Sequence, residues 1–413
     1  MVYQETVLLQ GHIIDSLILA KVLDRILSMG GSFDLQEVQI GKTREDPSRA
    51  KIVVQTESPA QLKSILEAIQ PHGASVERES DCQFQPAPGD GVFPDEFYAT
   101  THLPTQVRLR GSWINVDLIE MDLGIVVEPE RGVARAVPMA SVKGGESVVI
   151  GRQGVRVIPL QRPRKRDIFS FMESQVSVER PHGHMIHDIA TRMRQLRSGY
   201  REGQADSRIL FSGGPAIVQA GGQDALAWLI ENEYVQVLFC GNALAAHDLE
   251  MELYGTSLGY AHQAGQPLPH GHEHHLRTIN RIRSIGSIKK AVDAGLVKQG
   301  IMAACVRQAV QVVMAGTIRD DGPLPGVITD SIQAQEAMRK AIPGTGLALL
   351  VASTLHAVAT GNLLPASVPT VCVDINPSVP TKLADRGSFQ AVGLVMDAAS
   401  FLREIARELG WKP

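Results

Sequence analysis

The sequence is poor in cysteine, in excess basic charge and in long apolar runs, and each shortage excludes a class of protein. The four cysteines are widely scattered and form no CxxC pair, which argues against a disulfide framework and for the reducing cytoplasm. The formal net charge of -4 argues against a nucleic-acid surface. No apolar run reaches the roughly 18 residues of a membrane span. Residues 1–10 lack the basic segment and cleavage motif of a signal peptide. We therefore expect a cytoplasmic protein that binds neither nucleic acid nor membranes.

The chain is long enough for more than one domain. With 413 residues, of which 44% are hydrophobic and 20% charged, it has the size of two or three domains and the composition of a globular protein. We expect an α/β protein in three parts, which are residues 1–92, 93–206 and 207–413.

The first part alternates strand and helix patterns. Short strands are predicted at 5–10, 33–40, 51–56 and 74–76. A helix that opens at Asp15-Ser16 ends at Gly30-Gly31, a C-cap signal, and Ser58-Pro59-Ala60-Gln61 begins a second helix as a capping box. The order β-α-β-β-α-β predicts a ferredoxin-like α+β domain. Such domains can be regulatory, oligomerising or substrate-covering, and the pattern does not select among these roles.

The second part is predicted to be β-rich and to end in a helical connector. A linker rich in proline and glycine precedes it at 86–91. Glycines separate the strands that are expected at 106–109, 119–127, 148–150 and 155–158. The basic run 162–166 is expected to be the solvated start of the connector, which ends near Arg201.

The third part has the pattern of a doubly wound α/β domain. Its apolar runs are 209–211, 235–239, 312–315, 347–351, 370–373 and 392–395. Fully apolar strands that alternate with helices predict a parallel sheet covered on both faces. About seventy residues separate the second run from the third, and a connection of this length is commonly functional.

In such a sheet, ligands bind beyond the carboxyl ends of the strands, so the residues after each run are the candidates. Gly213-Gly214-Pro215 follows the first run and Gly241-Asn242-Ala243 the second, where glycines and a helix N-terminus can accept a phosphate group. Glu250, on the helix after the second run, is a candidate for binding a ribose hydroxyl. The alternatives are a tight strand-to-helix turn for the glycines and a carboxylate favoured by the helix dipole for Glu250.

The later strand ends also carry charged and polar side chains. Arg319, Asp320 and Asp321 follow the third run, and an arginine beside two carboxylates is costly to bury without a role. The candidates after the fourth, fifth and sixth runs are His356, Asn362, Asp374, Asn376, Lys382 and Asp397. Each could be a turn residue, but polar groups at successive ends of one sheet favour a binding site.

The run His270-Gly271-His272-Glu273-His274-His275 is the most metal-like motif, since histidine and glutamate at close spacing can bind zinc. It is not HExxH, no cysteine lies near it, and it falls in the long connection after the second strand. We therefore favour a lid or an oligomer contact, with an exposed loop and a structural zinc site as alternatives, and we predict no metal.

Several long motifs resemble one family. They are Gly11-His12-Ile13-Ile14-Asp15-Ser16, Gly30-Gly31-Ser32-Phe33, Phe93-Pro94-Asp95, Met121-Asp122, Ser287-Ile288-Lys289-Lys290-Ala291-Val292, the run 318–325, Asp374-Ile375-Asn376-Pro377 and Asp385-Arg386-Gly387-Ser388. The first of them resemble the conserved N-terminal domain named for lysine-oxoglutarate reductase/saccharopine dehydrogenase (LOR/SDH). The whole chain resembles archaeal-type ornithine cyclodeaminases and the C-terminal part of cyanobacterial arginine dihydrolase/ornithine cyclodeaminases.

The resemblance implies a Rossmann-like last domain that binds NAD and is similar in fold to deoxyhypusine synthase. It implies that His356 and Asn362 face the cofactor, and that Asp374-Asn376 and Asp397-Ala398 lie on its ribose or adenine side. A homodimer or homotetramer is implied as well, because folds of this kind place cofactors near subunit interfaces.

Two departures from the family pattern bear on the substrate. The position after Met121-Asp122 is often cysteine in the family and is Leu123 here, and the thiol that is common at 134–136 is missing. If those thiols touch substrate, this chain uses a different amino acid or has lost activity.

The resemblance implies conversion of ornithine to proline and ammonia, with NAD taking a hydride from the α-carbon and returning it to a cyclic imine. Arg319 and Lys382 are the candidates for binding the substrate carboxylate, and His356 is a candidate for proton transfer. The carboxylates that could accept protons from the amines are Asp122, Asp320 and Asp321. The alternatives are an NAD-dependent enzyme for lysine or another diamino acid, and a non-catalytic sensor of NAD or an amino acid.

Overall fold

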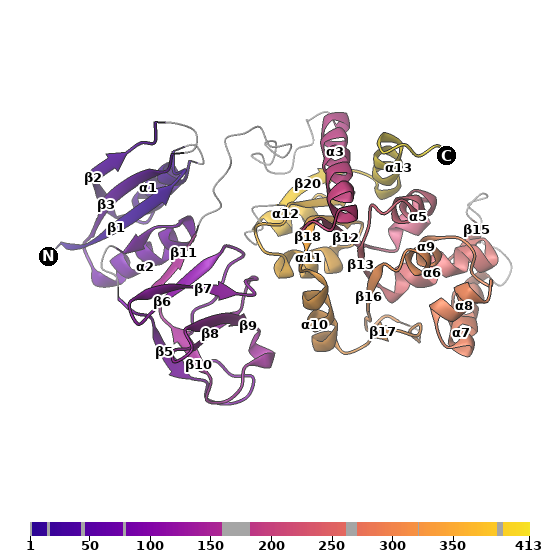
Figure 1. Cartoon of the computed structure of the whole chain (residues 1–413), viewed down its shortest axis with the longest axis horizontal. Coiled ribbons are helices and arrows are strands. Elements are labelled where there is room, and N and C mark those ends of the chain that lie inside the picture. The colour runs from indigo at the N-terminus through magenta and orange to yellow at the C-terminus, as the bar shows by residue number, and fades with distance from the viewer. Residues whose placement is uncertain are drawn as a thin grey trace. The chain divides into compact units, whose positions relative to one another are not determined.

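The computed structural model describes residues 2–14, 17–42, 46–76, 80–158, 182–261, 271–320, 322–385 and 391–413. The chain divides into two compact units (Figure 1). The first contains residues 1–167 and 364–367, and the second contains residues 168–363 and 368–413. Because the chain returns to the first unit at 364–367, the two units are joined by more than one covalent connection.

The first unit begins with a four-stranded antiparallel sheet packed on two helices. Its elements are β1 (Tyr3–Gly11), α1 (Ile18–Ser28), β2 (Ser32–Gln39), β3 (Ser48–Thr56), α2 (Pro59–Ile69) and β4 (Ser75–Val76), in the sheet order β2-β3-β1-β4. Val7 and Leu9 of β1 and Ile52 of β3 are fully buried on one face, where they pack with Ile26 of α1 and Ile65 of α2. The order of elements confirms the predicted ferredoxin-like domain.

Local sequence signals set the ends of these helices. The N–H of Gln61 donates a hydrogen bond to the Ser58 side chain and Pro59 is the first helical residue, as the capping box predicts. Gly30, with a φ of 77°, follows α1 in the left-handed conformation that favours glycine. The predicted helix start at Asp15-Ser16 lies outside the described residues.

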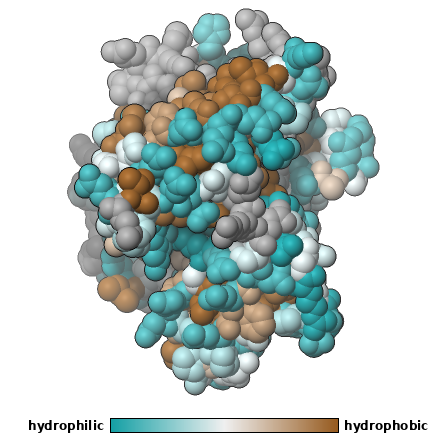
Figure 2. Space-filling view, turned by 90° about the vertical axis from the view of Figure 1, so that its left-hand side faces the viewer, coloured by the Kyte–Doolittle hydropathy of each residue, from teal (hydrophilic) through white to brown (hydrophobic). Residues whose placement is uncertain are grey.

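β2 is an edge strand that keeps apolar side chains exposed. Leu35 and Val38 are 39% and 40% exposed, and Ile40 just beyond the strand is 61% exposed. Figure 2, which faces the side where β2 lies in Figure 1, shows apolar side chains in brown among hydrophilic ones. An exposed apolar edge strand is available for pairing with another chain.

The rest of the first unit is a seven-stranded sheet, as the β-rich pattern predicts. Its strands are β5 (Gln83–Pro86), β6 (Thr105–Leu109), β7 (Ser112–Asp117), β8 (Gly124–Glu128), β9 (Val133–Val137), β10 (Ser147–Ile150) and β11 (Val155–Val157), in the order β11-β6-β7-β9-β8-β10-β5. All neighbours are antiparallel except β7 and β9. Val107, Ile125 and Val149 are fully buried in its core.

The structure differs from the sequence prediction at two places in this sheet. The strand predicted at 119–127 begins only at Gly124, because Leu118 and Asp122 have φ values of 59° and 64° and turn the chain. At the other place, β5 pairs with β10, so the sheet begins before the predicted domain boundary at residue 92 and includes Pro86 of the predicted linker.

Helix α3 (His182–Arg201) belongs to the second unit and not to the middle part in which the sequence prediction placed it. Met185, Ile189 and Met193 of α3 lie in the same core as Ile405 of α13 (Ala398–Glu408). An apolar stripe indicates that a helix buries one face, but it does not say which sheet that face meets. The basic run 162–166 lies outside the described residues.

The second unit is built on a parallel sheet. Its strands are β12 (Arg208–Gly213), β13 (Val237–Gly241), β16 (Gln311–Ala315), β17 (Val327–Ile328), β18 (Thr345–Val351), β19 (Thr370–Asp374) and β20 (Ala391–Val395). The other elements are α4 (Ala216–Gln219), α5 (Gln223–Glu231), α6 (Asn242–Tyr254), β14 (Thr256–Ser257), β15 (Tyr260–Ala261), α7 (His274–Ile285), α8 (Ile288–Asp293), α9 (Ile301–Arg307), α10 (Ser331–Ala341), α11 (Thr354–Leu363) and α12 (Ser378–Asp385). Within the described part of the chain, none of the helices combines the length and the apolar character needed to cross a membrane.

All six predicted apolar runs contribute strands to this sheet, whose order is β17-β16-β13-β12-β18-β19-β20. Every neighbouring pair is parallel. Without β17, and numbered along the chain, this is the order 3-2-1-4-5-6 of the dinucleotide-binding fold. Leu349 and Leu350 of β18 lie in separate cores, the second with Ala357 of α11, so helices cover both faces. The predicted Rossmann-like α/β fold is confirmed.

The long connection between β13 and β16 is anchored by a buried carboxylate on α6. Asp248 accepts hydrogen bonds from the N–H groups of Ile301 (2.7 Å) and Met302 (2.8 Å) at the start of α9, and from the side chain of Gln223 (2.6 Å). Burial raises the pKa of Asp248 to about 6, although these donors oppose the shift. Asp248 thereby fixes α9 against α6.

Residues 364–367, between α11 and β19, are part of the first unit. The carbonyl oxygen of Leu364 lies 2.8 Å from Nδ1 of His102, and the N–H of Ala366 donates to the carbonyl oxygen of His102 at 2.9 Å. Ala366 also packs with Leu103. The chain therefore contributes to the first unit from a point far beyond its predicted boundary.

Candidate functional site

The carboxyl edge of the parallel sheet is the candidate site, because the strand order reverses there between β12 and β18. In a sheet whose strands are all parallel, every carboxyl end lies at the same edge. The segments after β12, β13, β16, β18, β19 and β20 therefore meet along one line. This brings most of the predicted site residues to one side of the sheet, although they come from all parts of the second unit.

Close packing of the chain explains the two glycines at the end of β12. A Cβ atom on Gly214 would lie 1.8 Å from the carbonyl oxygen of Ala352, and one on Gly213 would lie 2.9 Å from the ring of Phe211. Ala352 itself has a φ of 55°, in the region that L-residues rarely adopt. A tight strand-to-helix turn, the alternative to a phosphate-binding role, accounts for this geometry. Pro215 is the residue directly before α4.

The start of α6 has the features of an anion site. Gly241 precedes the helix, whose first N–H groups have no side-chain cap. Asn242 is buried, and its side-chain oxygen accepts a hydrogen bond from the N–H of Leu324 at 2.9 Å. Asn242 thus ties the loop after β16 to this helix, and Ala243 is the next residue of its first turn.

His356 comes from α11 and lies over the end of β13. A Cβ atom on Gly241 would be 3.1 Å from the imidazole ring of His356. Ser353 Oγ lies 3.2 Å from Nδ1 of the same ring. Burial lowers the pKa of His356, while the carboxylate of Asp320 opposes that shift. The ends of β13, β16 and β18 therefore contribute to one electrostatic environment.

The loop after β16 exposes its arginine and holds its aspartate by hydrogen bonds within the loop. Asp320 accepts hydrogen bonds from the N–H of Thr317 at 2.8 Å and from its hydroxyl at 3.2 Å. Ile318 and Arg319 are exposed. Asp321 lies outside the described residues.

Asn362 offers an amide oxygen with unused hydrogen-bonding capacity. Its Oδ1 is buried and has no hydrogen-bond partner among the described residues. A buried acceptor without a partner is costly in a folded protein, and a ligand that donates to it removes that cost. Together with the uncapped start of α6, this atom fits a dinucleotide bound along the carboxyl edge.

The predicted residues after β19 and β20 make local capping contacts. Asp374 accepts from the N–H of Asn376 at 2.8 Å, and the Asn376 side chain accepts from the N–H of Ser378 at 3.0 Å. Asp397 caps α13, whose first residue is Ala398, by accepting from the N–H of Ser400 at 2.8 Å. Lys382 is exposed on α12. Their roles toward a cofactor or substrate stay predictions.

Glu250 does not belong to this edge as the structure has it. Its side chain is fully buried, and its two oxygens accept from the hydroxyl of Thr256 and the N–H groups of Leu258 and Gly259. Because the carboxylate is fully buried and held by this turn, a ribose hydroxyl does not reach it, and we do not assign that role to it. Asp122 lies exposed on a turn of the first unit, and its role in catalysis stays a prediction.

Sequence reasoning missed two features of this edge. The hydroxyls of Thr360 and Ser212 are fully buried and lie 3.3 Å apart, which links α11 to β12. The left-handed backbone of Ala352 is the other feature. Ser212, which directly follows the apolar run 209–211, was the available signal for the first feature. Nothing in the local sequence marks the second.

Three family models match consecutive parts of the chain. Residues 4–103 match the LOR/SDH bifunctional enzyme conserved region. Residues 104–186 match the first region of the arginine dihydrolase ArgZ-like C-terminal part, and residues 187–405 match its Rossmann fold. The chain belongs to the ArgZ-like C-terminal family. The observed fold and this membership agree, since both describe a Rossmann-like last domain.

Relatives of this family cover almost the whole chain. The ornithine cyclodeaminase of Methanopyrus kandleri is 49% identical over 98% of this chain and 97% of its own length. That of Methanocaldococcus jannaschii is 48% identical over 97% of this chain and 95% of its own length.

Solved structures of relatives show the same architecture. A LOR/SDH protein of Methanococcus maripaludis, 45% identical, has a TM-score of 0.75 over 80% of this chain and 98% of its own. The ternary complex of AgrE with ornithine and NAD+ is 37% identical, with a TM-score of 0.53 over 99% of this chain and 57% of that one. AgrE of Nostoc is named a bifunctional arginine dihydrolase/ornithine cyclodeaminase.

Proposed function

We propose that this chain is an NAD-dependent ornithine cyclodeaminase that converts ornithine to proline and ammonia. The observation that carries the proposal is the 49% identity to an ornithine cyclodeaminase over 98% of the chain. The structure of the relative AgrE with ornithine and NAD+ supports the same cofactor and substrate. Leu123, the departure noted in the sequence analysis, is buried in the core of the β-rich sheet.

The carboxyl edge of the parallel sheet would hold the cofactor. The uncapped N–H groups at the start of α6, at Asn242 and Ala243, suit the pyrophosphate. Gly213, Gly214 and Gly241 keep the strand ends free of side chains. Asn362 would accept a hydrogen bond from the cofactor at its partner-free Oδ1. Asp374, Asn376 and Asp397 with Ala398 would line the ribose or adenine side. When bound, NAD supplies reversible hydride acceptance.

The side chains of the same edge would position the amino acid and move its protons. Exposed Arg319 would pair with the substrate carboxylate in a charge-assisted contact, with Lys382 as the second candidate. Asp320 and Asp321 would accept protons from the amines, with Asp122 as a further candidate. His356, held neutral by its lowered pKa, can accept and return a proton next to Asp320.

The test is incubation of the purified chain with ornithine and NAD, followed by assays for ammonia, proline and NADH. Equal amounts of ammonia and proline without net NADH are expected. Formation of pipecolate from lysine, and no proline from ornithine, would show that lysine is the substrate. Tight NAD binding without turnover of any diamino acid would instead indicate a sensor.

We further propose that the protein is a cytoplasmic homodimer or homotetramer. The four cysteines are all buried and free, which suits a reducing compartment. The exposed apolar side chains of edge strand β2 suit contact with a second copy. Light scattering coupled to size-exclusion chromatography would measure the mass, and a monomer at micromolar concentration would contradict the oligomer.

A further inference from the structure

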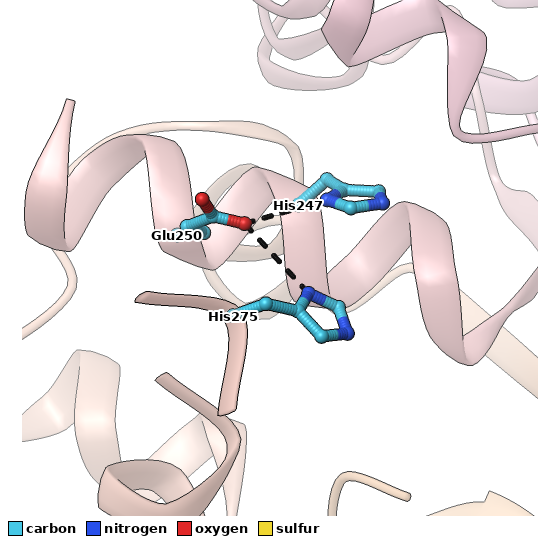
Figure 3. Close-up of side chains that lie close together, drawn as sticks. All are labelled: His247, Glu250 and His275. Atoms are coloured by element: carbon cyan, nitrogen blue, oxygen red, sulfur yellow. Dashed lines mark ion pairs between the residues drawn. The ribbon is translucent and has the colours of Figure 1, made fainter. Parts of the chain in front are cut away.

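His247, Glu250 and His275 form a cluster with two residues on α6 and one on α7 (Figure 3). One possible ligand atom from each residue lies within 4.8 Å of the others. We propose that this cluster binds a divalent transition-metal ion, with Zn²⁺ as the best match. The proposal does not depend on the proposed function, which requires no metal.

The helices bring the three side chains together. His247 and Glu250 are three positions apart on α6, so they share a face of that helix. His275 lies in the first turn of α7, which comes after the hairpin of β14 and β15. Figure 3 shows both imidazole rings beside the Glu250 carboxylate, with an Nδ1 atom of each directed toward it.

The separations suit a bound ion better than direct hydrogen bonds. Glu250 Oε2 lies 3.5 Å from Nδ1 of His247 and 3.7 Å from Nδ1 of His275. A charge-assisted N–H···O hydrogen bond is shorter, about 2.7 to 2.9 Å. Two ligand atoms that are each about 2.0 to 2.1 Å from a tetrahedral zinc ion lie about 3.4 Å apart. The carboxylate and each ring are therefore spaced as two corners of a coordination shell.

In each imidazole one nitrogen, Nδ1, faces Glu250 without forming a hydrogen bond. Nδ1 of His247 and Nδ1 of His275 are buried and have no hydrogen-bond partner among the described residues. The His247 side chain is 5% exposed, so water does not readily replace the missing partner. Two buried imidazole nitrogens that face one carboxylate without a hydrogen bond are costly in a folded protein. A cation between the three groups satisfies both at once.

The rest of the Glu250 carboxylate is held as a metal ligand requires. Oε1 accepts hydrogen bonds from the hydroxyl of Thr256 (2.8 Å) and the N–H of Gly259 (2.9 Å), and Oε2 accepts from the N–H of Leu258 (3.1 Å). Outer hydrogen bonds of this kind orient the ligands of metal sites.

The donor set selects the class of ion. Two imidazoles and one carboxylate are typical of zinc sites with three protein ligands and a fourth position for water. Mg²⁺ and Ca²⁺ prefer all-oxygen shells, so they are disfavoured here. The ion would join α6 to α7 and so stabilise the long connection between β13 and β16.

The site was not predictable from the run 270–275 on its own. That run supplies a single ligand of the cluster, and the other two come from α6, which the sequence prediction assigned to the cofactor site. The prediction of no metal rested on the absence of a complete local motif. The packing of α7 on α6 completes the ligand set.

Metal binding by the full chain tests the proposal directly. The protein would be treated with EDTA, transferred to metal-free buffer and titrated with Zn²⁺ alone in equilibrium dialysis, with Co²⁺ absorption as a spectroscopic readout of coordination. One ion per chain is expected. His275→Ala and His247→Ala should each weaken the affinity about tenfold or more. The control His187→Ala removes an exposed histidine that pairs with Glu408 on another face of the unit, and it should leave binding unchanged.

Two outcomes of this experiment would overturn the proposal and one would support it. Absence of stoichiometric Zn²⁺ and Co²⁺ binding by the wild-type chain would overturn the proposal, and so would equal affinities in the wild type and a folded His275→Ala variant. His275 is the less buried histidine, with 17% of its side chain exposed, so its variant is informative even if His247→Ala fails to fold. Loss of binding in His275→Ala with an unchanged melting temperature of the metal-free protein would support a site made by these residues.

Discussion

Each compact unit contains a seven-stranded sheet, and the two sheets differ in the direction of their strands. In the first unit, neighbours are antiparallel except for one pair, so successive strand ends fall at opposite edges. In the second unit all neighbours are parallel, so every segment that follows a strand begins at the same edge. The candidate residues gather in the second unit because of this difference in topology, since both sheets carry polar residues in their turns.

Burial follows the same division. β13 and β18, inside the parallel sheet, are buried along their whole length, whereas buried and half-buried residues alternate along β6, inside the sheet of the first unit. A parallel sheet must be covered on both faces, because its crossover helices pack there. Its edge is therefore the part of the second unit where backbone and side chains can meet a ligand. Four predictions test how far this contrast reaches.

The largest effect is expected for Gly214→Ala. The new Cβ would lie 1.8 Å from the carbonyl oxygen of Ala352, so the ends of β12 and β18 would have to separate. We expect a loss of about 3 kcal/mol or more in the free energy of unfolding, measured by urea denaturation. The control Gly89→Ala in the first unit meets no atom within 4 Å and should change stability by about 0.5 kcal/mol or less. Similar losses of stability in both variants would contradict the claim that the chain is packed unusually closely at the carboxyl edge.

Arg319→Ala should have the next largest effect, on activity alone. Loss of a charge-assisted contact of about 1.5 to 3 kcal/mol predicts a fall in kcat/KM for ornithine of roughly 10- to 100-fold. The melting temperature should not change, because Arg319 is exposed. Arg110→Ala, which removes an exposed arginine of the first unit paired with Glu130, is the matched control. An unchanged kcat/KM would show that Arg319 does not bind the substrate carboxylate and would favour Lys382 in that role.

Asn362→Ala should weaken NAD binding about tenfold, the value of one hydrogen bond of about 1.4 kcal/mol. Since its Oδ1 has no partner in the described structure, no internal bond of that atom is lost and the stability of the free protein should not fall. Isothermal titration calorimetry with NAD and thermal denaturation would measure the two quantities. A large drop in stability with unchanged NAD affinity would show that Asn362 stabilises the fold and does not bind the cofactor.

The smallest effect concerns the titration of His356. Burial lowers its pKa from the ordinary value of 6.5, so the folded state binds its proton less readily than the unfolded chain. The neutral ring's contribution to stability is thus present above that value and is lost as the pH falls below it. Because Asp320 opposes the shift, Asp320→Asn should lower the pKa further in an NMR titration. Asp90→Asn in the first unit should leave it unchanged, and a rise in either variant would contradict the assignment.

The sequence by itself determined the elements that have a strong local period or cap. The β-α-β-β-α-β order of the first part and the six apolar strands of the third appear where they were predicted. The Ser58 cap and the Gly30 helix end appear there too. These features are predictable because side-chain burial at a spacing of two or 3.6 residues, and the conformational preferences of glycine and proline, act over short stretches of chain.

The tertiary structure decided which of these elements meet. The packing of α3 on α13, the return of residues 364–367 to the first unit and the meeting of His275 with Glu250 each join parts that are distant in the sequence. Glu250 was predicted as a cofactor ligand because it follows a strand end, as the other candidates do. In the structure its two oxygens accept hydrogen bonds from the turn at 256–259. Such contacts depend on the free energy of the whole packed unit, in which strand order and loop paths compete, and no local period records the result.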